Sequence, residues 1–264
     1  MKTWIPDERN FAYLTWKQVD GLPRETTLLI LPTAAIEQHG HHLPLATDTL
    51  INNLLLGKAL KLVPKELPIY ALPALCYGKS NEHLGFPGTL SVSAQTFLAV
   101  VRDLGSSIAE GGFKKVVLYN THGGNTSLTD VLARDLRAEF GLRTFSLIGS
   151  PGAKFEGISQ QERTYGFHAG EIETAYLLHC APELVHTGDY TVNYIARVDH
   201  PELLKPEASA ANFAWLTRDI APSGVLGDPS HATAENGERW SNEVAARIAE
   251  ILIAMYNFEP RHGA

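Results

Sequence analysis

The sequence predicts an α/β protein with a mostly parallel sheet that helices cover on both faces. Short apolar runs alternate with longer helix-like runs, and several gaps between the apolar runs are long enough to hold a crossover helix. The chain has 264 residues, of which 44% are hydrophobic, so it can bury a substantial core. This length fits one large domain or two small ones. Because no boundary, repeat or low-complexity tract stands out, we expect a single domain over residues 1–264.

The predicted strands are short apolar runs, partly β-branched, which are typical of strands buried in a sheet. They are Thr27–Leu31, Ile69–Leu75, Lys115–Asn120 and Thr144–Ile148. The predicted helices are longer runs with apolar residues at helical spacing. They are Asp48–Leu62, Ser93–Glu110, Ser127–Phe140, His168–His179 and Glu235–Tyr256. The least regular stretch, with scattered Pro and Gly, is Thr187–Gly227, a candidate for an excursion that packs on a neighbouring subunit.

Charge and cysteine content narrow the class of protein. The net charge is -7 and the pI is near 5.9, and no cluster of Lys and Arg offers a phosphate-binding stripe, so we expect no nucleic-acid partner. The two cysteines, Cys76 and Cys180, make no disulfide framework and suit a reducing compartment. Residues 1–16 contain no uninterrupted apolar run. We therefore expect neither a signal peptide nor a membrane span, and a cytoplasmic location.

The segment after the first predicted strand holds one carboxylate and three imidazoles within six residues. These side chains are Glu37, His39, His41 and His42. If the strand geometry persists past Ala35, side chains two apart share a face, so Glu37 and His39 project together. The carboxyl end of a strand is where α/β proteins usually bind ligands, and divalent metals favour mixed imidazole and carboxylate ligands. A polar loop with exposed histidines is the alternative, and the spacing alone leaves both open.

Asp48 has two interpretations. Thr47 and Asp48 precede the apolar helical run, so either residue could be a helix N-cap. In isolation the capping role is favoured. A carboxylate at a helix start that faces the end of a strand can also bind a metal, and the sequence does not separate the two roles.

A second cluster lies where the strand Lys115–Asn120 ends. A glycine turn follows it and leads into a helix, an arrangement that points backbone N–H groups at an anion or a polarised carbonyl. The glycine spacing and the missing lysine do not match phosphate-loop or dinucleotide patterns. We expect His122 to lie on the same edge of the sheet as Glu37 and His39. A lone histidine there is more often structural, but its coincidence with the first cluster favours a function.

A third cluster begins at His168 and runs into a helix that is apolar nearly all round and should be buried. Glu173 falls within the apolar stripe, and because an unpaired buried charge is costly, it needs a metal, a cation or a proton. Glu171 poses the same question, or is a first-turn acid that the helix dipole favours. His168 could titrate near neutrality and do acid–base work. Its alternative role is a helix-start residue hydrogen-bonded to the backbone.

Four motifs resemble, in the same order, those of the creatininase (creatinine amidohydrolase) family. They are Glu37-Gln38-His39-Gly-x-His42-Leu43-Pro44-Leu45-x-Thr47-Asp48-Thr49, Phe86-Pro87-Gly88-Thr89, Asn120-x-His122-Gly-Gly-Asn125 and His168-Ala-Gly-x-x-Glu173-Thr174, within about Leu28 to Thr174. The resemblance implies a single-domain, three-layer α/β/α sandwich and commonly a homohexamer. It also implies a binuclear site with two divalent ions per chain, Zn2+ or Mn2+, with Fe2+ as a further option.

The resemblance further implies roles for individual residues. Four residues carried over by position are metal ligands: Glu37, His39, Asp48 and His122. Asp48 bridges the two ions. Creatinine-hydrolysing members place a further glutamate ligand two residues after the motif histidine, where this chain has Gly124. We expect Glu173 to supply the missing carboxylate, because it is the buried acid with no other evident partner.

The implied activity is that of a metal-dependent amidohydrolase, which cleaves a carbon–nitrogen bond, other than a peptide bond, in a small amide or cyclic amide. A hydroxide that bridges the ions attacks the carbonyl, because the ions lower the pKa of the shared water from about 16 towards 7. His168 then protonates the departing nitrogen, and His42 orients a ligand. The residues expected to line the substrate pocket are Ser80, Glu82, His83 and Asn125.

The substrate within the family is not determined by these motifs. The family includes creatinine hydrolases, deformylases, a peptide-trimming enzyme of redox-cofactor maturation and ring-opening cyclitol hydrolases. Creatinine hydrolases resemble one another in a tryptophan four residues before the motif histidine, where this chain has Thr164, and its four tryptophans lie elsewhere. Together with Gly124, this speaks against creatinine. A formamide deformylase, a cyclitol hydrolase and a catalytically inactive binding relative stay open, and the segment Gly224–Glu235, which also resembles the family, is assigned only packing or pocket closure.

Overall fold

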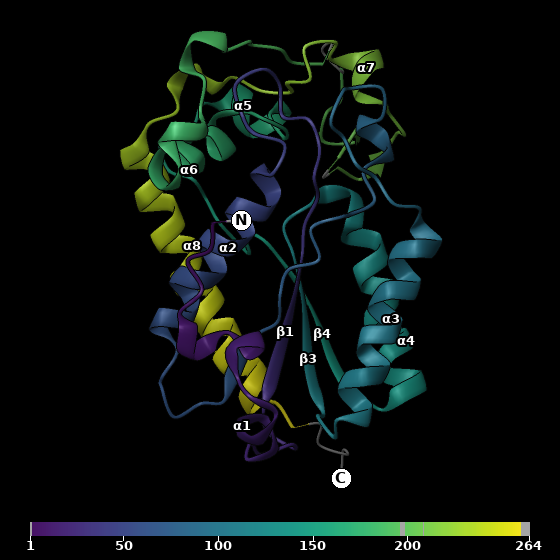
Figure 1. Cartoon of the computed structure of the whole chain (residues 1–264). Helices are drawn as coiled ribbons and strands as arrows, with labels where there is room; N and C mark the ends of the chain where they lie inside the picture. The colour runs from purple at the N-terminus through teal and green to yellow at the C-terminus, as the bar shows by residue number, and fades with distance from the viewer. Residues whose placement is uncertain (1, 196–198, 208, 260–264) are drawn as a thin grey trace.

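The centre of the molecule is a parallel four-stranded sheet, whose arrows lie between two groups of helices in Figure 1. This computed structural model describes residues 2–195, 199–207 and 209–259. The strands are β1 (Leu28–Thr33), β2 (Ile69–Ala71), β3 (Lys115–Asn120) and β4 (Arg143–Ile148), in the order β2-β1-β3-β4. The register pairs Thr33 with Asn120, so β1 and β3 end side by side.

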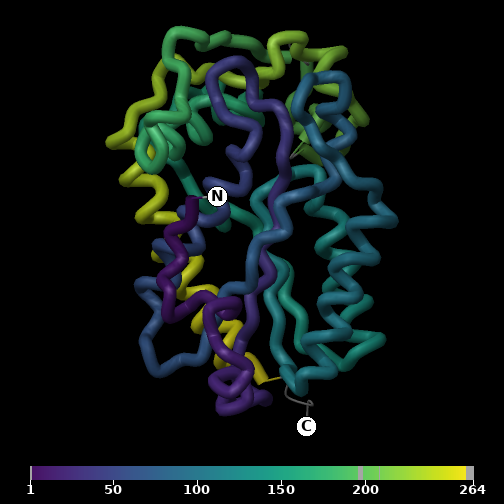
Figure 2. The backbone as a smooth tube through the Cα atoms, in the orientation of Figure 1, coloured from purple at the N-terminus to yellow at the C-terminus, as the bar shows by residue number. Residues whose placement is uncertain are grey.

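Helices cover both faces of this sheet, as the ribbon and tube views show (Figures 1 and 2). One layer consists of α2 (Thr47–Leu62), α6 (Glu171–Cys180) and α8 (Ala234–Asn257), which pack on one another. The other layer consists of α3 (Ala94–Glu110) and α4 (Thr126–Phe140). The predicted three-layer α/β/α class with a mostly parallel sheet is therefore confirmed, whereas the single domain over residues 1–264 stays a prediction.

Shorter elements connect these layers. The short helices are α1 (Trp16–Asp20), α5 (Gln160–Tyr165) and α7 (Thr217–Ile220), and a second small sheet pairs β5 (Leu204–Lys205) with β6 (Ala211–Asn212). Single 3₁₀ turns are η1 (Asp7–Arg9), η2 (Phe11–Tyr13), η3 (Asn81–His83), η4 (Gly123–Asn125), η5 (Pro182–Leu184), η6 (Thr187–Asp189) and η7 (Pro229–His231). Within the described ranges, no helix combines the length and apolar character that a membrane crossing requires.

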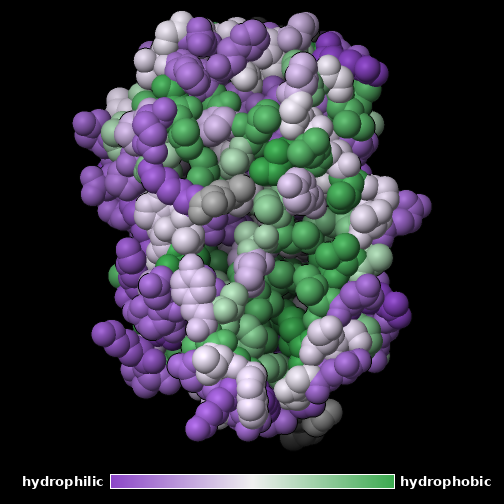
Figure 3. Space-filling model, viewed as in Figure 1, coloured by the Kyte–Doolittle hydropathy of each residue, from purple (hydrophilic) through white to green (hydrophobic). Residues whose placement is uncertain are grey.

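The strands divide their side chains between two apolar cores, because successive residues point to opposite faces of a sheet. Leu28 and Ile30 of β1 join the core that contains α2, α6 and α8, whereas Leu29 and Leu31 join the core with α3 and α4. Every residue of β1 and β3 is buried, as expected for a parallel sheet covered on both sides. On the face viewed in Figure 3, further hydrophobic residues gather along the middle, between the two helical layers.

Two predicted boundaries differ from the structure by three residues or more. β2 ends at Ala71, although Leu75 still forms an isolated bridge with Thr33. α6 begins at Glu171, so His168 precedes the helix and forms a bridge with Leu226 instead. The positive φ of Ala169 (54°) interrupts helical geometry just before α6 and explains the later start. The irregular stretch Thr187–Gly227 contains only short elements in its described part.

Candidate metal centre

The paired ends of β1 and β3 position the candidate metal centre. Thr33 donates a hydrogen bond to Asn120 (3.1 Å), and the amide of Asn125 donates one to the carbonyl of Ala34 (3.1 Å). These bonds hold the segment after β1, which carries Glu37, against the turn after β3, which carries His122. The predicted convergence of the first two clusters at this edge of the sheet is therefore present in the geometry.

Asp48 lies between two histidines, with one carboxylate oxygen directed at each. Its Oδ1 is 3.3 Å from Nε2 of His39, and its Oδ2 is 3.2 Å from Nδ1 of His122. Glu37 completes the cluster on the second side, since its Oε2 lies 3.3 Å from Nδ1 of His122. The side chains of all four residues are almost fully buried. This is the arrangement that a carboxylate bridging two cations requires.

The capping role for Thr47 and Asp48 is wrong. α2 begins at Thr47, so Ala46 occupies the N-cap position and no side chain caps the helix there. The Thr47 hydroxyl instead donates to the carbonyl of Pro44 (2.6 Å). Asp48 therefore lies in the first turn of α2, with its carboxylate beside the two histidines.

Three buried polar atoms of this cluster have no hydrogen-bond partner among the described residues. They are Oε2 of Glu37, Nε2 of His39 and Oδ2 of Asp48. A buried polar atom without a partner typically costs about 1–3 kcal/mol. Carboxylate oxygens and imidazole nitrogens are the donor atoms of zinc and manganese sites, so these residues fit a divalent metal.

The charges of the cluster also indicate that it fits a divalent metal. Burial lowers the pKa of His39, but Asp48, Glu173 and Glu37 outweigh it and raise this pKa to about 9. Burial likewise opposes protonation of His122, yet Glu37 and Asp48 raise its pKa well above the usual value. Without a metal, the acids therefore draw protons onto both histidines. Divalent ions would supply that positive charge instead and release the protons.

Glu173 joins the cluster on the His39 side. Its Oε2 lies 3.8 Å from Nε2 of His39 and accepts a hydrogen bond from the backbone N–H of Ala169 (2.6 Å). Burial raises its pKa to about 7. Glu171 does not belong to this group: its backbone N–H donates to Glu162 (2.9 Å), and burial and then Glu162 raise its pKa. The structure thus places Glu173, and not Glu171, beside the predicted ligands.

His168 contacts the cluster but also uses one nitrogen in a backbone contact. Its Nε2 lies 2.8 Å from the carbonyl of Gln38, and its Nδ1 lies 3.8 Å from Oε1 of Glu37. The imidazole lies against the rings of His39 and His83, with ring centroids 4.3 and 4.2 Å away. Burial, followed by the charge of His39, lowers the pKa of His168 well below its usual value, so this side chain is neutral in the metal-free protein.

The remaining predicted site residues take different places. His42 bonds to the hydroxyl of Thr174 (3.0 Å), next to Glu173, and His41 is exposed. His83 lines the cavity, with its Nε2 3.5 Å from Oε1 of Glu37. Two further residues predicted to line the pocket contact neighbouring polar groups. These are Ser80, 3.1 Å from Nε2 of His122, and Asn125, whose amide bonds the backbone of Ala34 and Lys79.

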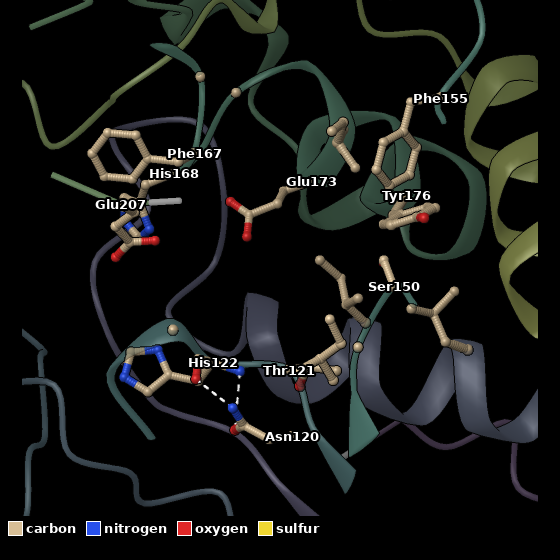
Figure 4. Close-up of a pocket in the computed structure, with 18 of the residues that line it drawn as sticks. Asn120, Thr121, His122, Ser150, Phe155, Phe167, His168, Glu173, Tyr176 and Glu207 are labelled. Atoms are coloured by element: carbon tan, nitrogen blue, oxygen red, sulfur yellow. Dashed lines mark hydrogen bonds between the residues drawn. The ribbon is translucent and has the colours of Figure 1, made fainter. Parts of the chain in front are cut away.

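Two adjoining cavities open onto the cluster, with volumes of about 490 and 230 Å³. Figure 4 shows the larger one, with Glu173 pointing toward the space above His122 and with Glu207 and His168 at one side. Its far end is apolar and includes Phe155 and Tyr176. The two cavities share His122, His168, Glu173 and Glu207. A bound molecule can therefore reach both the acid–histidine cluster and the apolar end.

Sequence reasoning missed two residues of these walls. Trp215 lines the smaller cavity, with its ring 5.8 Å from that of His83 and 5.3 Å from that of Phe167. Glu207 lines both cavities, and burial followed by Glu82 raises its pKa. Both come from the irregular stretch before Gly227, where no periodicity or motif marked them. The start of the segment Gly224–Glu235 contacts the site, since the carbonyl of Gly224 accepts a hydrogen bond from the side chain of Gln38 (3.1 Å) and Leu226 forms a bridge with His168.

The fold and this centre together are typical of a metal-binding α/β/α hydrolase. The family profile described as creatininase, creatinine amidohydrolase, matches residues 12–252, so the chain belongs to the creatininase family. The mycofactocin precursor peptide peptidase of Mycobacterium ulcerans (strain Agy99) is 34% identical over 224 residues, 83% of this chain and 81% of the relative. The creatinine amidohydrolase of Pseudomonas putida is 28% identical over 259 residues, 91% of each. A solved structure described as creatininase Mn shares the fold, with a TM-score of 0.73, 24% identity and coverage of 94% of this chain and 99% of its own.

Proposed function

We propose that this family member is a metal-dependent hydrolase that holds two divalent ions per chain and cleaves a carbon–nitrogen bond of an amide. The observation that carries the proposal is the position of Asp48, with one buried oxygen directed at His39 and the other at His122. The unpartnered buried atoms of the same cluster support it, because a cation would satisfy them. Because one solved relative is described as creatininase Mn, we propose Mn2+ as a candidate for the bound metal, together with Zn2+.

The donors fall into two sets that share Asp48. Glu37 and His122 would hold one ion, and His39 and Glu173 the other. When bound, the ions supply positive charge that polarises the substrate carbonyl and lowers the pKa of an attacking water towards about 7.

His168 is the proposed proton carrier. Its Nε2 lies 2.8 Å from the carbonyl of Gln38, and in the tautomer in which Nε2–H donates to this carbonyl, the lone pair of Nδ1 is on the side of Glu37. Nδ1 accepts the proton of the attacking water and then gives it to the departing nitrogen. The same nitrogen atom therefore takes up and releases the proton. The ring contacts with His39 and His83 fix the orientation of this imidazole. His83, Phe167 and Trp215 shield the reacting groups from bulk water.

The proposed substrate is a small amide or cyclic amide, with a formamide or a ring-opening reaction as the alternatives within the family. A short peptide is a second candidate, and two observations favour it. The chain is 34% identical to a peptide peptidase, and the cavity of about 490 Å³ continues from the cluster into an apolar end. Such an end suits an apolar group attached near the scissile bond.

The test is a hydrolysis panel with protein whose metal content has been measured. The panel contains creatinine, formamides, other cyclic amides and short peptides that end in apolar residues. We expect turnover of at least one amide and its loss on removal of the metals. Zero hydrolysis across the panel by fully loaded protein would favour a binding relative without turnover.

A further inference from the structure

The turn after β3 has no space for a side chain at Gly124. A Cβ there would meet Oε1 of Glu82 at 2.3 Å, the carbonyl of Lys79 at 2.3 Å and Nε2 of His122 at 2.6 Å. Creatinine hydrolases resemble one another in carrying a glutamate ligand at this position. In this chain a carboxylate reaches the same space from a different segment, because Glu82 belongs to η3 (Asn81–His83).

Glu82 lies beside the ligands on the His122 side of the cluster. Its Oε1 is 3.6 Å from Nε2 of His122, and one donor atom each from Glu37, Glu82 and His122 lie within 4.8 Å of one another. Its side chain is only 14% exposed. The second oxygen is 3.7 Å from Nζ of Lys79, so one oxygen faces the lysine and the other faces Nε2 of His122, the ring nitrogen opposite the one near Glu37 and Asp48.

The carboxylate of Glu37 in the same group also has an oxygen available to a cation. Oε2 of Glu37 is buried, directed toward His122 and without a hydrogen-bond partner among the described residues. Glu173 does not serve this side, because its contacts are with His39 and His168. Each side then has one carboxylate of its own beside the shared Asp48, namely Glu37 on the His122 side and Glu173 on the His39 side, so Glu82 would add a second carboxylate to the His122 side.

We propose that Glu82 is a metal ligand of the His122 side, in the role that creatinine hydrolases give to a glutamate at the position of Gly124. A side chain at position 124 would displace the Glu82 carboxylate as well as the carbonyl of Lys79. Glu173 remains the carboxylate of the His39 side. This inference rests on the proposed metal-dependent function and adds to it the residue that completes one of the two sites.

The experiment compares Glu82→Gln with Glu207→Gln, a matched control. Glu207 lines the same cavities, but it is in none of the donor groups found among the described residues. Metal-free protein is titrated with Mn2+ against a competing chelator, and bound metal is counted by mass spectrometry. We expect Glu82→Gln to weaken one site by more than about a hundredfold, beyond the tenfold to hundredfold typical of residues that only orient a ligand. Glu207→Gln should bind as the wild type does.

Two further measurements separate ligation from a folding defect. Metal-free Glu82→Gln should melt within about 2 °C of the wild type, because glutamine keeps the size and shape of the side chain. In Co2+-loaded protein, its visible spectrum should change, because loss of a ligand alters the coordination of the metal. Unchanged Mn2+ affinity and an unchanged Co2+ spectrum would overturn the assignment of Glu82 and leave the proposed function standing. Wild-type protein that binds no metal would overturn both.

Discussion

Replacing Asp48 by asparagine gives the sharpest prediction, because its two oxygens face the two halves of the centre. Asparagine keeps the size of the side chain but removes its charge and one acceptor oxygen. The variant should therefore fold and lose tight binding at both sites. In the wild type, an ion at a hundred times its Kd stabilises the fold by about 2.7 kcal/mol per site.

Two sites together would contribute about 5 kcal/mol at that concentration. For a chain of this size, 1 kcal/mol corresponds to about 2–4 °C, so saturating Mn2+ should raise the melting temperature of the wild type by about 10–20 °C. The Asp48→Asn variant should show less than a quarter of this shift. The assay is thermal unfolding with and without Mn2+, and Asp130→Asn on the exposed face of α4 is the control. A full metal-dependent shift in Asp48→Asn would refute the bridging role.

Four further predictions concern the same centre. Metal affinity should rise with pH up to about pH 9, because His39, with a pKa of about 9, must release its proton before it binds a metal; affinity that is constant between pH 6 and pH 9, measured by calorimetry, would contradict this. His168→Ala should keep both metals but lose turnover by about a hundred- to ten-thousand-fold, and unchanged turnover would remove His168 from the mechanism. Glu173→Gln should lose metal from the His39 side, so a variant with both metals and full activity would exclude Glu173 as a ligand. Trp215→Ala should raise KM with unchanged metal content, since the ring lines the cavity and lies against His83 and Phe167, which are not among the predicted ligands; an unchanged KM would mean that the substrate does not reach this ring.

The sequence was sufficient to predict the parallel sheet and the site residues that directly follow its strands. Buried parallel strands are continuous apolar runs, and polar side chains directly after such a run must lie at the edge of the sheet. For this reason the sequence alone predicts that Glu37, His39 and His122 lie together. The third cluster was harder to place, because His168 and Glu173 do not follow a sheet strand.

The errors fall where local patterns do not determine the backbone. The positive φ of Ala169 delays the start of α6, and no propensity rule predicts that conformation for an alanine. Trp215 and Glu207 reach the cavity from a stretch without periodicity, so only tertiary structure reveals them. Glu162 is a further case: its buried carboxylate accepts bonds from three donors. These are the backbone N–H groups of Glu171 and Asp228 and the hydroxyl of Tyr194.

The most direct test of the central claim is anomalous diffraction from crystals of the protein grown with Mn2+. The account predicts two strong peaks per chain, one on each side of the Asp48 carboxylate, within coordination distance of His39 and of His122 respectively. No peak at Asp48, or a single peak that contacts neither histidine, would contradict a binuclear metal centre in this protein.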